Sequence, residues 1–129
     1  MMFRVGSGLA VGALALVIVA RPTIAAAGDD AAAGQALFKG KCAACHTVDA
    51  NRVGPKLQDV VGRPVASAAG YTYSPALKKL GGVWTPAKID QFLSAPQKMA
   101  PGSKMYLQVG DVKQRQQIGA YLQSISTKK

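Results

Sequence analysis

The chain has 129 residues, which suits one domain plus a short processing segment and leaves little room for two cores. Its apolar content of 49% excludes a disordered chain. Sixteen Lys and Arg residues stand against six acidic residues, all of them aspartate, so the formal charge is +10. A surplus of this size favours rapid encounter with acidic partners.

Residues 1–27 have the pattern of a signal peptide. Arg4 gives a positive start, residues 5–20 are uncharged and mostly apolar, and Ala25-Ala26-Ala27 forms a small-residue tract typical of a cleavage site. We expect cleavage after Ala27, with residues 28–129 as one domain. The alternative is an uncleaved membrane anchor, although the apolar run is shorter than the roughly 20 residues that comfortably span a bilayer.

Export predicts a periplasmic protein in a bacterium. Loss of residues 1–27 would remove Arg4 and Arg21, which leaves fourteen basic residues against six aspartates and a charge of +8. Nucleic acid is the obvious competitor as a partner for so basic a chain. Export and the lack of a long Lys/Arg run argue against it, so the charge is interpreted as a distributed surface field.

The first part of the predicted domain combines one helix with a long irregular stretch. Asp30 is expected to cap a helix over about 31–41, in which Gly34, Leu37 and Phe38 share a face. From 47 to about 73 the chain is punctuated by glycine and proline, a composition that predicts loops and turns.

Two short helices are expected next. Ser74-Pro75 predicts a start and Gly81-Gly82 a stop, which gives a helix ending at Leu80. Thr85-Pro86 predicts a cap and first turn of a helix that ends near Ser94. Residues 95–102 are proline-punctuated and predict a loop.

Asp111 is expected to cap a last helix that runs to about Ser126. Its Ile118, Tyr121, Leu122 and Ile125 form one apolar stripe. No alternating strand pattern is present in the sequence. The sequence therefore predicts an all-α domain with helices at both ends, in which the long loops pack on a cofactor instead of on one another.

Cys42-Ala43-Ala44-Cys45-His46 fits C-x-x-C-H, the attachment signature of c-type haem. Two thiols at this spacing can each reach one vinyl group of the same porphyrin, and the histidine that follows is then held beneath the iron. A thioredoxin-like dithiol, half of a zinc site and an ordinary disulfide are the alternatives. The dithiol needs a βαβ context that is missing here, and a structural zinc would lack an evident fourth ligand.

If haem is bound, His46 is the only histidine available as a ligand. Methionine is the usual second axial ligand for electron transfer, and it raises the reduction potential. After the leader, Met99 and Met105 are both candidates. Either could instead be an ordinary core residue.

The sequence resembles the class I c-type cytochromes, in particular the small soluble bacterial proteins allied to mitochondrial cytochrome c. The resemblance covers about Gly34 to Leu122, and its second motif is Pro101-Gly102-Ser103-Lys104-Met105. It implies the cytochrome c fold around one covalent haem c, bound by Cys42 and Cys45, with His46 and Met105 as axial iron ligands.

The resemblance also implies roles around the haem. The carbonyl of Pro55 would accept a hydrogen bond from His46, and Arg63, Tyr73 and Trp84 would bind a haem propionate. Leu57 and Leu93 would pack on the haem. Two positions depart from many relatives, because Leu77 and Phe92 are apolar where those relatives have hydrogen-bonding side chains.

The function implied is that of a single-electron carrier, not an enzyme. Its donor would be a quinol–cytochrome c reductase, and its acceptor a terminal oxidase or a photosynthetic reaction centre. We expect a monomer without a small-molecule substrate. The residues expected to ring an exposed haem edge and to dock on acidic membrane complexes are Lys39, Lys41, Lys98, Lys104 and Lys113. A peroxidase or gas-binding protein with a displaced methionine is the rival class.

Overall fold

The computed structural model describes residues 26–126 together with residues 8, 12 and 16–19. Its helices are α1 (Ala26–Lys41), α2 (Pro75–Leu80), α3 (Pro86–Ser94), α4 (Pro96–Met99) and α5 (Val112–Ser124). No strand forms among the described residues, where one isolated antiparallel bridge joins Pro64 to Val83. The all-α prediction is therefore confirmed. Most of the predicted leader lies outside the described residues, and no described helix is long and apolar enough to cross a bilayer.

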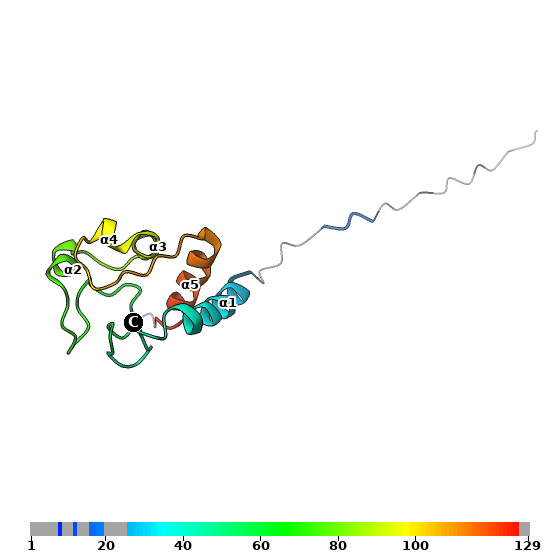
Figure 1. The fold of residues 1–129 in the computed structure, drawn as a ribbon. Coiled ribbons are helices and arrows are strands. Elements are labelled where there is room, and N and C mark those ends of the chain that lie inside the picture. The colour runs from blue at the N-terminus through cyan, green and yellow to red at the C-terminus, as the bar shows by residue number, and fades with distance from the viewer. Residues whose placement is uncertain (1–7, 9–11, 13–15, 20–25, 127–129) are drawn as a thin grey trace, which may run out of the picture.

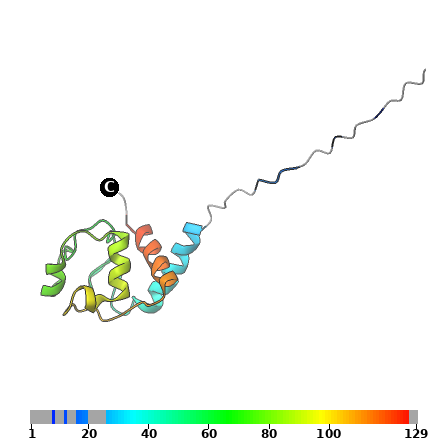
Figure 2. The ribbon, with the colours of Figure 1, turned by 90° about the horizontal axis from the view of Figure 1, so that it is seen from above.

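The first and last helices pack directly against each other, as Figure 1 and Figure 2 both show. They can approach closely because Gly34 presents no side chain at the crossing. A β-carbon at Gly34 would overlap the backbone carbonyl of Gln117 and the Cβ of Tyr121. One turn further along α1, the rings of Phe38 and Tyr121 contact each other at a tilt of 54°, with their centroids 5.3 Å apart. The helices thus cross closely at a glycine and are held there by one aromatic pair.

Three predicted helix starts are confirmed by their caps. The side chains of Ser74, Thr85 and Asp111 accept hydrogen bonds from the backbone N–H groups of Leu77, Lys88 and Gln114, respectively. Such bonds satisfy amide groups that have no partner within the helix. The predicted stop of α2 is confirmed as well, because Gly81 has a φ of 61°, a conformation that favours glycine.

Two local predictions are wrong. Asp30 does not cap the first helix, because α1 begins at Ala26 and Asp30 lies inside it. The Asp30 carboxylate instead pairs with the ammonium of Lys113 on α5, 2.8 Å away. The proline-punctuated segment is also not all loop, because Pro96 opens the single turn of α4. Proline suits a first helical position, where its missing N–H would have no partner.

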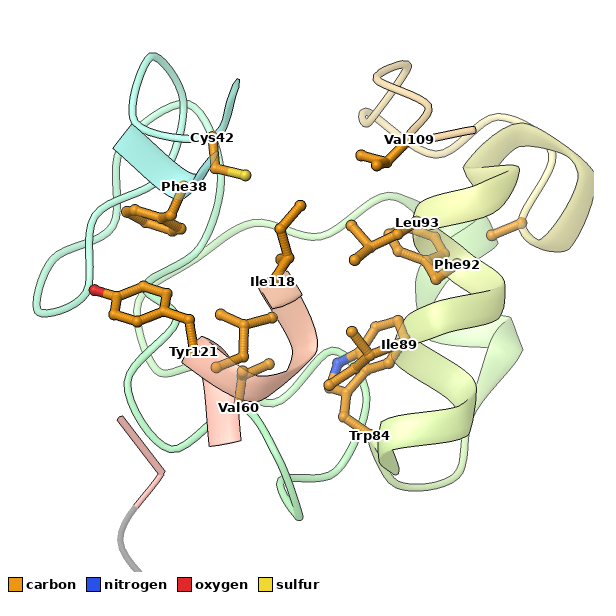
Figure 3. Packing of buried hydrophobic residues seen from close by; sticks show 12 residues of the cluster. Phe38, Cys42, Val60, Trp84, Ile89, Phe92, Leu93, Val109, Ile118 and Tyr121 are labelled. Carbon is orange, nitrogen blue, oxygen red and sulfur yellow. The ribbon is translucent and has the colours of Figure 1, made fainter. Parts of the chain in front are cut away.

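The third helix lies between α2 and the α1/α5 pair (Figure 2). The irregular chain from 42 to 73 contains no helix, as predicted. Apolar side chains from the end of α1, from α3 and from α5 point toward one another in Figure 3. Ile118 of α5 is the most buried of them, with 1% of its surface exposed. These three elements and the loops enclose the cavity described next.

Candidate cofactor site

One cavity of about 220 Å³ collects the predicted site residues. All eight of them line it: Cys42, Cys45, His46, Pro55, Arg63, Tyr73, Trp84 and Met105. Leu57 and Leu93 line it too, whereas Met99 is not among the lining residues. The structure thus separates the two methionines that spacing alone left equivalent.

The two cysteines and the histidine lie on a tight turn that continues α1. The amide of Cys42 donates to the carbonyl of Phe38 at 2.8 Å, and the amides of Cys45 and His46 both donate to the carbonyl of Cys42. Cys42 is buried and Cys45 is exposed, and both are free thiols. Burial raises the pKa of the Cys42 thiol. A catalytic dithiol has a lowered thiol pKa, so the Cys42 environment does not favour the thioredoxin-like alternative.

The orientation of the His46 ring is fixed by its neighbours. Its Nδ1 lies 2.8 Å from the carbonyl oxygen of Pro55. A carbonyl only accepts hydrogen bonds, so Nδ1 carries the proton and Nε2 keeps its lone pair. Burial lowers the pKa of His46, which favours this neutral form, although the hydrogen bond to Pro55 acts the other way. The side chain is thereby prepared to act as a ligand through Nε2.

Met105 lies on a loop between α4 and α5, and its surroundings in the cavity are largely apolar. Leu77 and Phe92, the two apolar residues at positions where many relatives have hydrogen-bonding side chains, line the same cavity. Ser103 contributes a hydroxyl to the lining, and only 2% of its surface is exposed.

The polar part of the cavity lining contains an unsatisfied donor. Two nitrogens of the Arg63 guanidinium donate to the carbonyls of Gln58 and Lys56, each at 3.0 Å. Its third nitrogen, Nε, is buried without a hydrogen-bond partner. A buried unpaired donor costs about 1–3 kcal/mol, and more on a charged group, so this site suits an anionic ligand group. The Tyr73 hydroxyl accepts from the amide of Ala68 at 3.0 Å, which leaves its own hydrogen to donate.

The predicted ring of lysines is only partly assembled. Lys41 and Lys104 line the cavity. Lys39 and Lys98 are exposed but do not line it, and Lys113 is paired with Asp30 between α1 and α5. Two exposed apolar side chains next to Met105 add to the lining, since 74% of Tyr106 and 40% of Leu107 is exposed.

Sequence reasoning missed the roles of three residues. A β-carbon on Gly54 would overlap the His46 ring, so this glycine makes room for the imidazole. Tyr71 lines the cavity and donates from its hydroxyl to the carbonyl of Val53 at 2.8 Å. Gln97 on α4 bonds the loop that carries Met105. A glutamine in a proline-rich segment gives no pattern from which such a contact could be predicted.

The residues present fit a haem. Its flat apolar ring suits a cavity lined mainly by apolar side chains, and its carboxylates suit the unpaired Nε of Arg63. The paired thiols and the neutral imidazole match the attachment and ligation that c-type haem requires. When bound, the haem supplies an iron that gains and loses one electron.

Comparisons with known proteins identify the family of the chain. Residues 31–126 match the family model described as cytochrome c. Cytochrome c2 of Agrobacterium tumefaciens is 48% identical over 84 residues, which cover 60% of this chain and 75% of that protein. A c-type cytochrome cy of Rhodobacter capsulatus is 40% identical over 98 residues, which cover 74% of this chain and 49% of that protein.

Solved structures give the same result. Cytochrome cH from Methylobacterium extorquens has a TM-score of 0.70 at 44% identity, with 74% of this chain and 98% of that chain covered. Ferricytochrome c2 from Rhodopseudomonas palustris has a TM-score of 0.68 at 38% identity with the same coverage. Some relatives are much longer, and the match covers only 39% of a cytochrome c homolog of Rickettsia felis.

The match to the family model spans most of the domain, and the fold and the cavity lining agree with it. The chain belongs to the cytochrome c family, whose members carry electrons on covalently attached haem c.

Proposed function

We propose that this protein is a single-electron carrier whose haem c is attached to Cys42 and Cys45 and ligated by His46 and Met105. One observation carries the proposal. These four side chains, which come from two distant parts of the sequence, line the same cavity, and Met99 does not.

The roles of the remaining residues follow from their contacts. Pro55 orients His46 through its carbonyl, and Gly54 leaves the space that the ring occupies. Arg63 and Tyr73 would donate to the haem carboxylates, and Trp84 lines the same cavity. If His46 and Met105 both hold the iron, no ligand position would be left for a substrate, and the protein would transfer electrons without catalysing a reaction of its own.

The partners proposed are acidic membrane redox complexes. The donor is a quinol–cytochrome c reductase, and the acceptor is a terminal oxidase or a photosynthetic reaction centre. The surplus of basic residues supports this choice, together with Lys41 and Lys104 at the cavity. Residues 1–27 serve as a leader that is cleaved on export, so the domain acts in the periplasm. We further propose that it acts there as a monomer.

Optical spectroscopy and mass spectrometry test the proposal on protein made with a working haem-maturation system. We expect a covalent haem adduct, a sharp c-type alpha band in the reduced form and a weak far-red methionine-to-iron band in the ferric form. Met105→Ala should abolish the far-red band, and the matched variant Met99→Ala should keep it. Colourless protein with the mass of the bare polypeptide would contradict haem attachment.

Carbon monoxide separates the carrier from the rival class. A reduced protein whose iron has two side-chain ligands should bind the gas slowly or not at all. Rapid binding by the wild type would contradict a filled ligand set and would favour a peroxidase or gas-binding protein. Met105→Ala should bind it readily, which provides the positive control.

A further inference from the structure

The loop that carries Met105 is held by few backbone hydrogen bonds of its own. The amide of Ser103 donates to the carbonyl of Ala100 at 3.0 Å, and the amide of Val109 donates to the carbonyl of Leu93 at 2.8 Å. Between these two points, residues 104–108 make no backbone–backbone hydrogen bond within the described part of the chain. Side chains must therefore fix the position of this loop.

Gln97, on the single turn of α4, supplies most of that attachment. Its Nε2 donates to the carbonyl of Met105 at 2.8 Å and to the carbonyl of Ser103 at 2.7 Å, and it also lies 3.1 Å from the Ser103 hydroxyl. Its Oε1 accepts from the amide of Gly102 at 3.1 Å. One half-buried side chain thus bonds three residues of the loop, including Met105 itself.

The chemistry of the amide group suits this position. Two carbonyls require a donor with two hydrogens, and the Gly102 amide requires an acceptor beside it. An amide side chain provides both, and a flipped amide would bring its oxygen against two carbonyl oxygens. Two other side chains hold the loop: the exposed Lys104, whose ammonium donates to the carbonyl of Thr72, and Ser103, whose hydroxyl lies 3.5 Å from the Met105 carbonyl. Gln97 makes the shorter of the two bonds to the Met105 carbonyl, 2.8 Å against 3.5 Å, and it reaches that carbonyl from α4 rather than from within the loop.

We propose that Gln97 is a positioning residue that holds Met105 in place at the cavity and thereby sets how readily the thioether yields to competing ligands. The inference rests on the proposed ligation by Met105. It acts through the backbone, because Gln97 touches the Met105 carbonyl and does not line the cavity. Loss of the Gln97 amide removes two short hydrogen bonds to the loop, each of modest strength. Together they should shift the equilibrium between the closed and the open loop about tenfold toward the open form.

The test is a pH titration of the far-red band in the ferric, haem-loaded protein. As pH rises, deprotonated amines and hydroxide compete with the thioether. Gln97→Met keeps the length of the side chain but removes the amide, so the midpoint of band loss should fall by about one pH unit, which corresponds to a tenfold easier opening. Cyanide binding to the ferric protein at neutral pH should become about tenfold faster for the same reason.

A second variant keeps the result interpretable if Gln97→Met folds poorly. Gln97→Glu retains an acceptor for the Gly102 amide but sets a carboxylate oxygen against two carbonyls. Its midpoint should also fall. Ser126→Ala is the matched control, because the Ser126 hydroxyl is buried and bonds the amide of Val61 and the carbonyl of Leu122, away from the loop. It should lower the stability to denaturant without moving the far-red midpoint.

The outcomes separate the two proposals. A wild type that lacks the far-red band overturns ligation by Met105, and this inference with it. A wild type that has the band, together with Gln97 variants whose midpoint and cyanide rate equal those of the wild type, overturns the positioning role alone. Equal midpoint shifts in Ser126→Ala and Gln97→Met would also overturn it, because the effect would then be one of general stability.

Discussion

The imidazole of His46 is positioned by what its neighbours provide and by what they lack. The Pro55 carbonyl accepts from Nδ1 and thereby selects the tautomer with a lone pair on Nε2. Gly54, one residue earlier, lies so close that any side chain would collide with the ring. The Gly54-Pro55 pair thus fixes both the orientation and the protonation of His46.

Gly54→Ala should destabilise the haem-loaded protein by about 1–3 kcal/mol, because the added methyl group overpacks a filled site. The free energy of unfolding in denaturant measures the effect. Gly110→Ala is the matched control, since a β-carbon there meets nothing within 4 Å. Equal stability of the two variants would mean that the His46 ring moves aside at no cost.

At the scale of elements, the α1/α5 crossing joins the two ends of the domain. It combines the bare backbone of Gly34 with the Phe38–Tyr121 ring pair and the Asp30–Lys113 ion pair. Because α1 leads directly into Cys42, the same crossing also fixes the position of the turn that carries the two thiols and His46. A substitution that disrupts the crossing should therefore also disturb the cofactor site.

Gly34→Ala should cost stability although alanine favours helices by about 1 kcal/mol over glycine. Its β-carbon would overlap the Gln117 carbonyl and force the helices apart, a penalty of about 1–3 kcal/mol or more. Gly40→Ala provides the contrast in the same helix, because its β-carbon meets nothing within 4 Å. Thermal or denaturant unfolding should show a loss for Gly34→Ala and no loss for Gly40→Ala, and the reverse order would contradict the close crossing.

The Asp30–Lys113 pair predicts a pH dependence of stability. The hydrogen bond from Lys113 lowers the pKa of Asp30 below its ordinary value of 3.8. A carboxyl with a lowered folded-state pKa adds stability above pH 3.8, and this contribution disappears as the pH falls through the lowered value. The difference in free energy of unfolding between wild type and Asp30→Asn should therefore be present near neutral pH and shrink in acid.

Lys113→Gln provides the control for that measurement. In this background Asp30→Asn should have little further effect near neutral pH, because the pair is already broken. An unchanged Asp30→Asn effect would show that the carboxylate acts through another partner.

At the scale of the whole molecule, the positive charge is spread over the domain, and two lysines of the described residues line the cavity. Lys41 at the end of α1 and Lys104 in the Met105 loop are these two residues. The exposed Tyr106 and Leu107 lie beside Lys104 and provide apolar contact area. A surface of this kind combines long-range attraction of acidic partners with a small exposed apolar patch.

Electron transfer to an acidic membrane oxidase should slow as salt is added, since the Debye length falls from about 30 Å at 0.01 M to about 10 Å at 0.1 M. Lys41→Gln should reduce the second-order rate at low salt more than Lys79→Gln, which removes the same charge from α2. Stopped-flow kinetics at several ionic strengths measures both. Equal effects of the two variants would indicate that net charge alone matters and that the lysines at the cavity have no special role.

Local sequence signals predicted the caps at Ser74, Thr85 and Asp111 because a cap depends on residues within one turn. They misplaced the start of α1, since Asp30 finds its partner on α5, more than eighty residues away. The single turn of α4 was missed because a segment with several prolines is typical of a loop. The bond that makes it a helical turn, from the amide of Ala100 to the carbonyl of Pro96, is visible only in the structure.

The sequence by itself determined the covalent attachment chemistry, because the spacing within Cys42–His46 is a local property of five residues. It also implied Met105, through a motif shared with a family. Only the tertiary structure decided which methionine lies at the cavity, that the Nε of Arg63 is buried without a hydrogen-bond partner and that Gln97 bonds the Met105 loop. These features depend on contacts between segments far apart in the chain, and no spacing along a sequence encodes the distance between two such segments.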